Sequence, residues 1–421
     1  MPTTALSLSA LWNRWSFAII LALTSYIVLV RVLRYRRMAK IQAPFVAGQR
    51  PLSSMTVKEA HGIMAQLQEL EFPRAFAKAR RMALLKAGAI PTMSKLFAVT
   101  GQNNRRSAGK RAVDTEILLR ESQSQPRDSV RYAAAVARMN YLHARYRRAN
   151  KITNDDLLHT LGDGLAEILN VVEREEWRGL TDVEKCALGI FHRNLGEDML
   201  IPFDTLPSNP DAEGWIDGLH FASELVKWTI DYEWEVARPM ATNDQYVRVY
   251  VDSALPGCIR PVVRQMLGGD LDDCMRRSLG LESPSIPLAM TLHLFRTIRK
   301  MFLRHFALPR PSYRAVQLVH SEPNPKTRLY NFGRKGLQPW YMRPTLWARW
   351  GPAATLVRVF GGKTPGSSGD RYFPGGYDLM TIGPEPQRGK GLDDMQSDME
   401  LIRARGVATC PFSGKKAGEF S

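Results

Sequence analysis

The feature that most constrains this chain is an apolar stretch close to its N-terminus. From Trp15 to Val30 the sequence contains no charged residue. Extended to Leu33, the stretch makes a helix of about 28 Å at a rise of about 1.5 Å per residue, close to the roughly 30 Å hydrocarbon thickness of a bilayer. A cleaved signal peptide is the alternative, but arginines and no small-residue cleavage site follow the stretch. Residues 15–33 are therefore predicted to form a transmembrane helix.

Basic residues flank this predicted span unequally. Only Arg14 precedes it, whereas five lie at or beyond its other end: Arg31, Arg34, Arg36, Arg37 and Lys40. Because the cytosolic flanks of membrane helices carry the excess of lysine and arginine, residues 1–14 are expected in the lumen and the rest of the chain in the cytosol. The sequence has no Asn-x-Ser/Thr sequon, which agrees with a cytosolic body.

The composition narrows the class of partner. The 421 residues carry a formal net charge of +17, yet no basic-aromatic repeat, zinc-ligand spacing or glycine-rich RNA motif accompanies the charge, so no nucleic acid is expected. A membrane surface suits the charge better, since basic residues crowd beside the apolar stretch. The four cysteines form no CxxC pair and no disulfide framework, which suits a reducing compartment.

The region after the anchor predicts a mainly α fold. A clean apolar stripe recurs at helical spacing: Leu157, Leu161, Leu165, Ile168 and Val172. Thr181 and Glu184 have the capping-box pattern of a helix start. No internal repeat and no βαβ rhythm is visible, so a helical catalytic domain is predicted over residues 34–310.

Beyond Pro309 the chain changes character. Aromatic residues, prolines and glycines dominate from Pro311 to Pro386, a composition that is too irregular for helix and too aromatic for disorder. A last amphipathic helix is expected around residues 392–402. Residues 311–421 are therefore predicted to form an extended wrap over the helical core, followed by this terminal helix.

One helix carries the most informative histidine. Asp128 or Ser129 can cap its start, and the alanine-rich run up to Arg148 favours helix. His143 lies deep in this run, with small and apolar residues around it and Arg147 one turn later. Such an imidazole is a candidate axial ligand for a buried iron, as in globins. The alternative is an ordinary core or interface histidine.

The remaining histidines are weaker candidates. His293 has apolar neighbours at helical spacing and is the next histidine expected to be buried. His159 and His220 fall off the apolar stripes of their helices and are expected at the surface. The pattern leaves His192 ambiguous.

A polar stripe precedes the histidine helix. Arg111, Asp114 and Thr115 share one face with Leu118 on a helix, because the spacings are three, four and seven. A guanidinium, a carboxylate and a hydroxyl on one stripe can line a polar pocket. The alternative is a solvated helix start with a local pair between Arg111 and Asp114.

The common catalytic motifs are missing. The sequence has no HExxH, no GxSxG and no GxGxxG at a strand–helix junction. Gly362-Lys-Thr364 resembles the end of a P-loop, but that pattern requires glycine at position 357, where Val357 stands. What remains is one buried-looking imidazole in a helical scaffold, with a polar face upstream.

The chain nevertheless resembles a known family over most of its length. It resembles the ER-bound oxygenases of fungal mycophenolic acid biosynthesis (MpaB type) and, more distantly, the bacterial latex-clearing rubber oxygenases, which share the catalytic domain. The order and spacing of these landmarks carry the resemblance: Leu70–Pro73, Gly88–Thr92, Thr100–Gln102, Asp114–Thr115, Leu142–His143, Asp156–Leu161, Glu176–Arg178, Leu195–Gly196, Arg349–Pro352, Tyr372–Tyr377 and Cys410–Phe412.

The resemblance implies a haem b protein with a globin-like helical core. The rubber oxygenases hold iron with a histidine in an HxxxR helix, which is matched here by His143 and Arg147 as cofactor-binding residues. They place an Arg-x-x-Lys-Thr motif over the distal face, which here reads Arg111-x-x-Asp114-Thr115. A carboxylate therefore replaces the distal lysine, and Asn140 stands where an arginine is usual.

The function implied is that of a single-pass ER-membrane oxygenase that uses O₂ as co-substrate. Its expected reaction is oxidative cleavage of a C=C bond in a small lipophilic substrate, such as a prenyl-type (meroterpenoid) intermediate, with catalytic roles for Arg111, Asp114 and Thr115. Two alternatives stay open. One is a haem oxidase of the same fold that oxidises a polyketide-type metabolite differently, and the other is a non-catalytic, membrane-anchored haem or binding protein. The sequence predicts no oligomeric state.

Overall fold

The computed structural model describes residues 8–46, 49–101, 104, 107–209, 214–252, 257–317, 319–334, 336–407 and 410–412, with side chains from residue 15 on. Within these ranges the chain is mainly helical, as predicted, and its one named strand is β1 (Ser367–Asp370). Residues 1–7 of the predicted lumenal N-terminus, and the chain end from residue 413, lie outside the described ranges.

The helices follow one another along the chain, and the longest connections precede α9, α14 and α16. Their bounds are α1 (Leu8–Gln42), α2 (Val57–Gln66), α3 (Pro73–Ala87), α4 (Pro91–Val99), α5 (Ala108–Ser124), α6 (Val130–Arg148), α7 (Asn154–Glu175), α8 (Asp182–Asp198), α9 (Gly218–Val236), α10 (Ala241–Tyr250), α11 (Arg260–Gly268), α12 (Asp273–Ser278), α13 (Ile286–His305), α14 (Leu346–Trp350), α15 (Pro352–Val359) and α16 (Leu392–Ala404). A single π-helical turn (Leu67–Glu71) joins α2 to α3.

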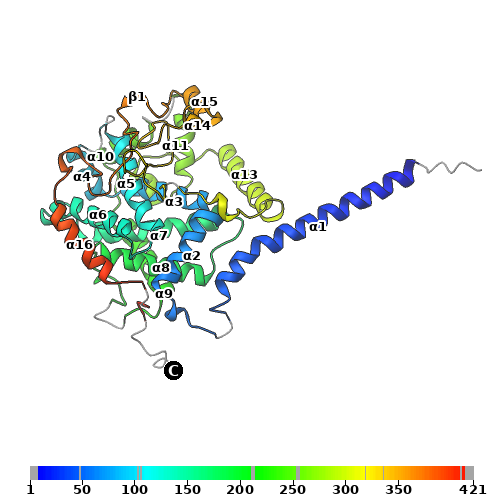
Figure 1. Cartoon of the computed structure of the whole chain (residues 1–421), viewed down its shortest axis with the longest axis horizontal. Helices are drawn as coiled ribbons and strands as arrows, with labels where there is room; N and C mark the ends of the chain where they lie inside the picture. The colour runs from blue at the N-terminus through cyan, green and yellow to red at the C-terminus, as the bar shows by residue number, and fades with distance from the viewer. Residues whose placement is uncertain are drawn as a thin grey trace, which may run out of the picture.

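Helix α1 projects from the body as one uninterrupted rod (Figure 1). Its part from Trp15 to Gln42 is long and apolar enough to cross a membrane. From Val30 on, α1 packs into the body: Val30 is fully buried, and the Tyr35 ring meets the Trp177 ring edge-on at 5.1 Å. The body therefore begins within the helix itself, with no linker after the apolar segment.

The centre of the body is built from α7, α8 and α9, with α2 and α3 packed on them. The apolar stripe predicted on α7 is buried along its whole length. Gly189 and Gly218 allow α8 and α9 to cross very closely, because a Cβ on Gly189 would lie 1.8 Å from the Gly218 carbonyl oxygen. The predicted capping box of α8 is confirmed, since Thr181 and Glu184 exchange hydrogen bonds with each other's backbone N–H.

Two helix predictions differ from the structure. The polar run from Asn103 to Lys110 predicts a loop, but α5 begins at Ala108. No helix was predicted over the residues of α10. α10 contains β-branched and polar residues of modest helix propensity, so its local pattern is weak. Packing stabilises it: Tyr246 is buried and stacks on Phe97 of α4 at 5.5 Å.

The segment after Pro311 is largely irregular, as predicted, and covers α5 and α6. Among the described residues, its only β-bridges outside β1 are two isolated antiparallel ones, Val319–Phe332 and Tyr330–Tyr377. Arg138 of α6 donates to the backbone carbonyls of Ile382 (2.8 Å) and Gln387 (3.0 Å). The terminal helix α16 then packs along α6.

Candidate functional site

Helices α5 and α6 form a hairpin that is tightly packed near its turn and less so at its far end. All buried residues of α6 lie between Tyr132 and Met139, and none is buried from residue 140 to 148. On α5, Thr115 is exposed although its neighbours Asp114 and Glu116 are buried. The sequence-predicted site residues lie at this less packed end.

His143 is a deep imidazole without a hydrogen-bond partner. Burial, reinforced by the nearby Arg147 guanidinium, lowers the pKa of His143 to about 4, so the ring is neutral at cellular pH. The side chain nevertheless keeps some accessible surface. Within the described part of the chain, neither ring nitrogen makes a hydrogen bond.

The other buried histidines are held by partners. His192 has its pKa lowered to about 4 by burial in the same way, but its Nδ1 lies 2.7 Å from the Leu188 carbonyl oxygen. His159 is fully buried and its Nε2 lies 3.0 Å from Glu233 Oε1, so the prediction of a surface position was wrong. The prediction that His293 is buried was also wrong, because it is exposed.

Arg111 faces the stripe of α6 that carries His143. Burial lowers the pKa of Arg111, whereas the nearby phenols of Tyr250 and Tyr146 raise it. Tyr146 follows His143 by three residues and so lies on the same side of α6. The structure thus brings the Arg111 guanidinium and the His143 imidazole to the same end of the hairpin, with Tyr250 of α10 beside them.

Asp114 and Thr115 are not joined in one polar pocket. Asp114 is buried and accepts hydrogen bonds from Lys110 Nζ and the Tyr341 hydroxyl, each at 2.7 Å. Burial raises the pKa of Asp114, and these two partners oppose that shift. The alternative of a local pair between Arg111 and Asp114 is therefore replaced by the pair between Lys110 and Asp114, while Thr115 is exposed.

Arg147 and Asn140 connect α6 to neighbouring segments. Arg147 donates to the Leu200 carbonyl at 2.8 Å, just after α8, and lies close enough to His143 to lower the pKa of its imidazole. Asn140 donates to the Asp198 carbonyl and to the Asp398 carboxylate of α16, both at 2.9 Å. These contacts fix the C-terminal half of α6 against α8 and α16.

Sequence reasoning missed a buried charged cluster around Lys86. Its ammonium lies 2.8 Å from Asp163, 2.8 Å from Glu233 and 3.3 Å from Glu167. The pKa of Glu167 is raised to about 7, first by burial and then by the Asp163 carboxylate. On α7, the polar residues His159, Asp163 and Glu167 recur at a spacing of four. This spacing is the one signal in the sequence that α7 is buried on two sides.

The same cluster contains a possible ligand set for a cation. The ligand atoms of His159, Asp163 and Glu233 lie within 4.8 Å of one another. Lys86 already lies between the two carboxylates and supplies a positive charge there. The cluster is therefore explained as a buried ion-pair network.

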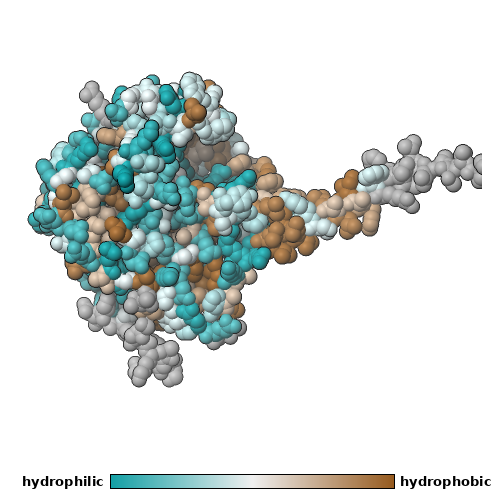
Figure 2. Space-filling model, viewed as in Figure 1, coloured by the Kyte–Doolittle hydropathy of each residue, from teal (hydrophilic) through white to brown (hydrophobic). Residues whose placement is uncertain are grey.

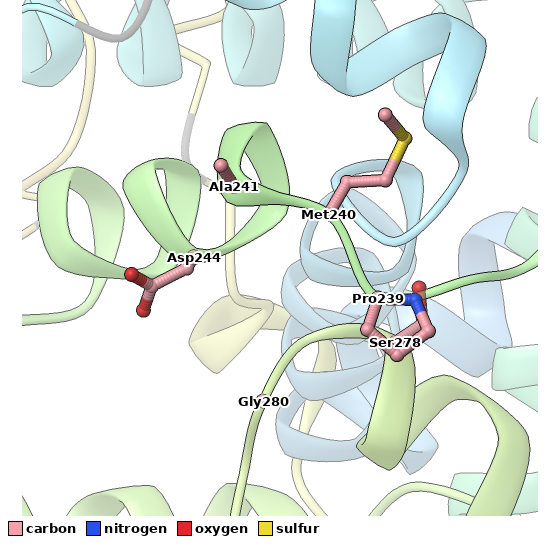
Figure 3. A pocket seen from close by; sticks show the side chains of 6 residues that line it. All are labelled: Pro239, Met240, Ala241, Asp244, Ser278 and Gly280. Atoms are coloured by element: carbon pink, nitrogen blue, oxygen red, sulfur yellow. The ribbon is translucent and has the colours of Figure 1, made fainter.

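A surface cavity of about 370 Å³ lies where α10 begins (Figure 3). It is lined by Pro239, Met240, Ala241, Asp244, Ser278 and Gly280. The two side chains of this cavity that could take part in catalysis lie apart, since Figure 3 shows Asp244 and Ser278 on opposite sides. The Ser278 hydroxyl also donates to the Ala89 carbonyl at 2.6 Å, so it is committed to the fold. This cavity lacks the groups for a catalytic site.

The chain is similar to three fungal proteins along most of its length, although no protein-family model matches it. It is 33% identical over 406 residues to the "ER-bound oxygenase mpaB'" of Penicillium brevicompactum, covering 95% of both chains. It is 31% identical over 376 residues to the "ER-bound oxygenase mpaB" of the same fungus, covering 89% of this chain and 88% of the relative. The mpaB protein of Penicillium roqueforti (strain FM164) is 35% identical over 288 residues, which cover 66% of this chain and 95% of the relative. With an apolar N-terminal helix, a helical body and this similarity from end to end, the chain belongs to the ER-bound oxygenase family of MpaB type.

Proposed function

We propose that this protein is a haem-dependent oxygenase in which His143 binds the iron of haem b. The observation that carries the proposal is the His143 imidazole, which is neutral and has no hydrogen-bond partner among the described residues. Membership of a family whose relatives are named oxygenases supports an oxidoreductase.

The residues around His143 suit a haem group. An iron ligand must offer an unprotonated ring nitrogen, and a pKa of about 4 keeps His143 unprotonated at cellular pH. Arg147 brings a guanidinium near this ring, and guanidinium groups pair well with carboxylates such as the haem propionates. By contrast, His192 has a similarly low pKa, but it is packed inside the core and only 3% exposed, whereas His143 keeps accessible surface.

When bound, haem would supply the iron at which O₂ reacts. Arg111 and Thr115 offer N–H and O–H donors at the same end of the hairpin, and donors of this kind stabilise negative charge as it develops on oxygen. Asp114 has a different task, because Lys110 and Tyr341 already occupy its carboxylate. We assign Asp114 as a positioning residue that holds the C-terminal segment against α5, in place of the catalytic role that the resemblance implied.

The proposed substrate is a lipophilic intermediate of prenyl type, such as a meroterpenoid. Cleavage of its C=C bond places one oxygen atom of O₂ on each carbon, so two carbonyl fragments form and no external reductant is consumed. An enzyme with an apolar anchor meets such a substrate in the bilayer, where it partitions. The protein is proposed to cross the ER membrane once, with its body in the cytosol, as the excess of basic residues after α1's apolar part and the names of the relatives support.

The absorption spectrum of the detergent-solubilised full chain tests the haem proposal. We expect a Soret band that disappears in His143→Ala and persists in His192→Ala, which removes an imidazole of equally low pKa. Circular dichroism verifies that both variants fold. A folded protein without a Soret band, or a band unchanged in His143→Ala, contradicts the assignment.

Labelled oxygen then tests the reaction. With ¹⁸O₂ and a prenyl-bearing substrate, cleavage places one label in each of two carbonyl fragments. A single labelled atom in an uncleaved product identifies a different oxidation. Haem binding without turnover of such substrates contradicts the oxygenase assignment and leaves the haem site intact.

A further inference from the structure

Helix α13 turns its polar side toward the body and its apolar side away from it. A helix on a globular protein normally turns its apolar side to the core. Here Arg296 donates to Asp270 at 2.6 Å and Arg299 donates to Glu176 at 3.0 Å. Both carboxylates belong to buried residues of the body. The basic side of α13 is therefore its inward side.

The apolar side of α13 points away from the body. No residue of this 20-residue helix is buried. Its large apolar side chains recur at helical spacing and are 55–77% exposed: Ile286, Met290, Leu294, Ile298, Met301 and Phe302. Soluble proteins rarely expose a continuous apolar surface of this length. Figure 2 shows hydrophobic surface where α1 leaves the body, and α13 lies beside that point in Figure 1.

The C-terminal end of α13 is fastened to α1. The Tyr26 hydroxyl donates to the Phe306 carbonyl at 2.8 Å, and Arg34 Nε donates to the Ala307 carbonyl at 2.9 Å. Tyr26 belongs to the apolar part of α1 and lies about 10 Å along the helix from Leu33, at about 1.5 Å per residue. If α1 crosses a bilayer with residues 15–33, the Phe306 backbone must lie at the depth of Tyr26.

This depth is the one that helices lying in a membrane interface reach, roughly 5–10 Å into the boundary between headgroups and acyl chains. We propose that the apolar side of α13 inserts into the same bilayer that α1 crosses, as a second membrane contact that lies along the surface. The proposal rests on the position of α13 and is independent of the haem site.

A lipid bilayer fits this surface better than a second copy of the chain. The C-terminal end of α13 touches the apolar part of α1, where the Tyr26 hydroxyl donates to the Phe306 carbonyl. Arg304 and Arg310 are exposed next to it, where they meet the anionic headgroups of a cytosolic leaflet. A dimer interface would have to exclude lipid from a surface that α1 carries into the membrane.

Quenching of an attached fluorophore by lipid tests the proposal. The full chain is prepared with Met301→Cys in a Cys258→Ser background, because Cys258 is the exposed native thiol, and is labelled with an environment-sensitive dye. It is reconstituted into phosphatidylcholine vesicles that carry nitroxide groups on their acyl chains. Ile286→Cys reports on the other end of α13. Lys227→Cys is the matched control, since its side chain is 78% exposed on α9.

We expect nitroxide lipid to quench the dye at Met301 most, at Ile286 less, and at Lys227 not at all. All four substituted positions are exposed, so folding is preserved, and circular dichroism verifies it. A dye at Met301 that nitroxide lipid leaves bright and aqueous iodide quenches overturns the proposal. A dye that neither agent reaches assigns the surface to a second copy of the chain, and this too overturns it.

Discussion

The Tyr341 hydroxyl donates a hydrogen bond of 2.7 Å to Asp114 Oδ1, joining the C-terminal segment to α5 across 227 residues. The second carboxylate oxygen of Asp114 accepts from Lys110, whose ammonium also donates to the Gly383 carbonyl at 2.9 Å. One buried carboxylate thus fastens two points of the irregular C-terminal segment next to the hairpin that carries His143.

Tyr341→Phe tests how strongly this carboxylate fastens the segment. The change leaves a buried carboxylate oxygen without its donor, so we expect the free energy of unfolding to fall by about 1–3 kcal/mol. Urea denaturation followed by circular dichroism measures it. Tyr313→Phe is the control, because Tyr313 is exposed, and it should leave the midpoint unchanged. Equal midpoints for both variants would show that the bond contributes nothing.

Arg111→Gln and Thr115→Val test the proposed oxygen-side donors. Removing one donor that stabilises developing charge typically lowers kcat by a factor of about 10²–10³. We expect that loss in steady-state O₂ consumption, with the haem content unchanged, because neither residue is the proposed iron ligand. Arg148→Gln, at an exposed position of α6, serves as the control. Normal turnover in both variants would remove Arg111 and Thr115 from the mechanism.

Glu167→Gln tests the Lys86 cluster through the pH dependence of stability. The folded-state pKa of Glu167 is about 7, above its ordinary 4.5, so the folded state holds a proton that the unfolded state releases first. This bound proton adds at most about 3 kcal/mol to the free energy of unfolding. The full amount is present below pH 4.5 and is lost as the pH rises through 7. We expect Glu167→Gln to flatten this fall in urea titrations between pH 5 and 8. Glu173→Gln, exposed on the same helix, should keep the wild-type slope.

Asp198→Ala tests a second buried network. Asp198 accepts two hydrogen bonds of 2.7 Å from Arg127 and one of 2.9 Å from the Tyr132 hydroxyl, and it also pairs with Arg405. Removing it leaves the buried Arg127 guanidinium with only the Glu197 carboxylate, 3.6 Å away, among the described residues, and breaking a buried pair typically costs about 3–5 kcal/mol. Thermal unfolding should show a clearly lower midpoint than in Glu197→Gln, whose side chain is more exposed. A midpoint within error of the control would contradict the role given to Asp198.

Elements with strong local signals were predictable from the sequence. The spacing of apolar residues from Ile286 to His305 predicts a helix there, and α13 has these bounds. The capping box that begins α8 was also predicted as observed. The apolar stripe of α7 is buried as its spacing indicated. These features depend on residues within a few turns of one another, and such residues define helical periodicity directly.

What depended on distant partners was not predictable. His159 is polar by its local pattern, and its burial follows from Glu233 and Lys86, which lie 74 residues after and 73 residues before it in the chain. His293 has an apolar local pattern, and its exposure follows from the arginines that turn the other side of α13 to the body. A local pair of Asp114 with Arg111 was one of two alternatives, but the partners of Asp114 are Lys110 and the distant Tyr341. The iron-ligand role of His143 remains a prediction.

The burial of Val30 and the contact of Tyr35 with Trp177 make α1 and the body a single rigid piece. A membrane helix whose apolar length does not match the local bilayer adjusts by tilting. Here the whole body must tilt with it, because no joint absorbs the change. Bilayer thickness would therefore set the angle at which the body leans over the lipid surface, so sterol content or organelle identity becomes a mechanical input to the enzyme.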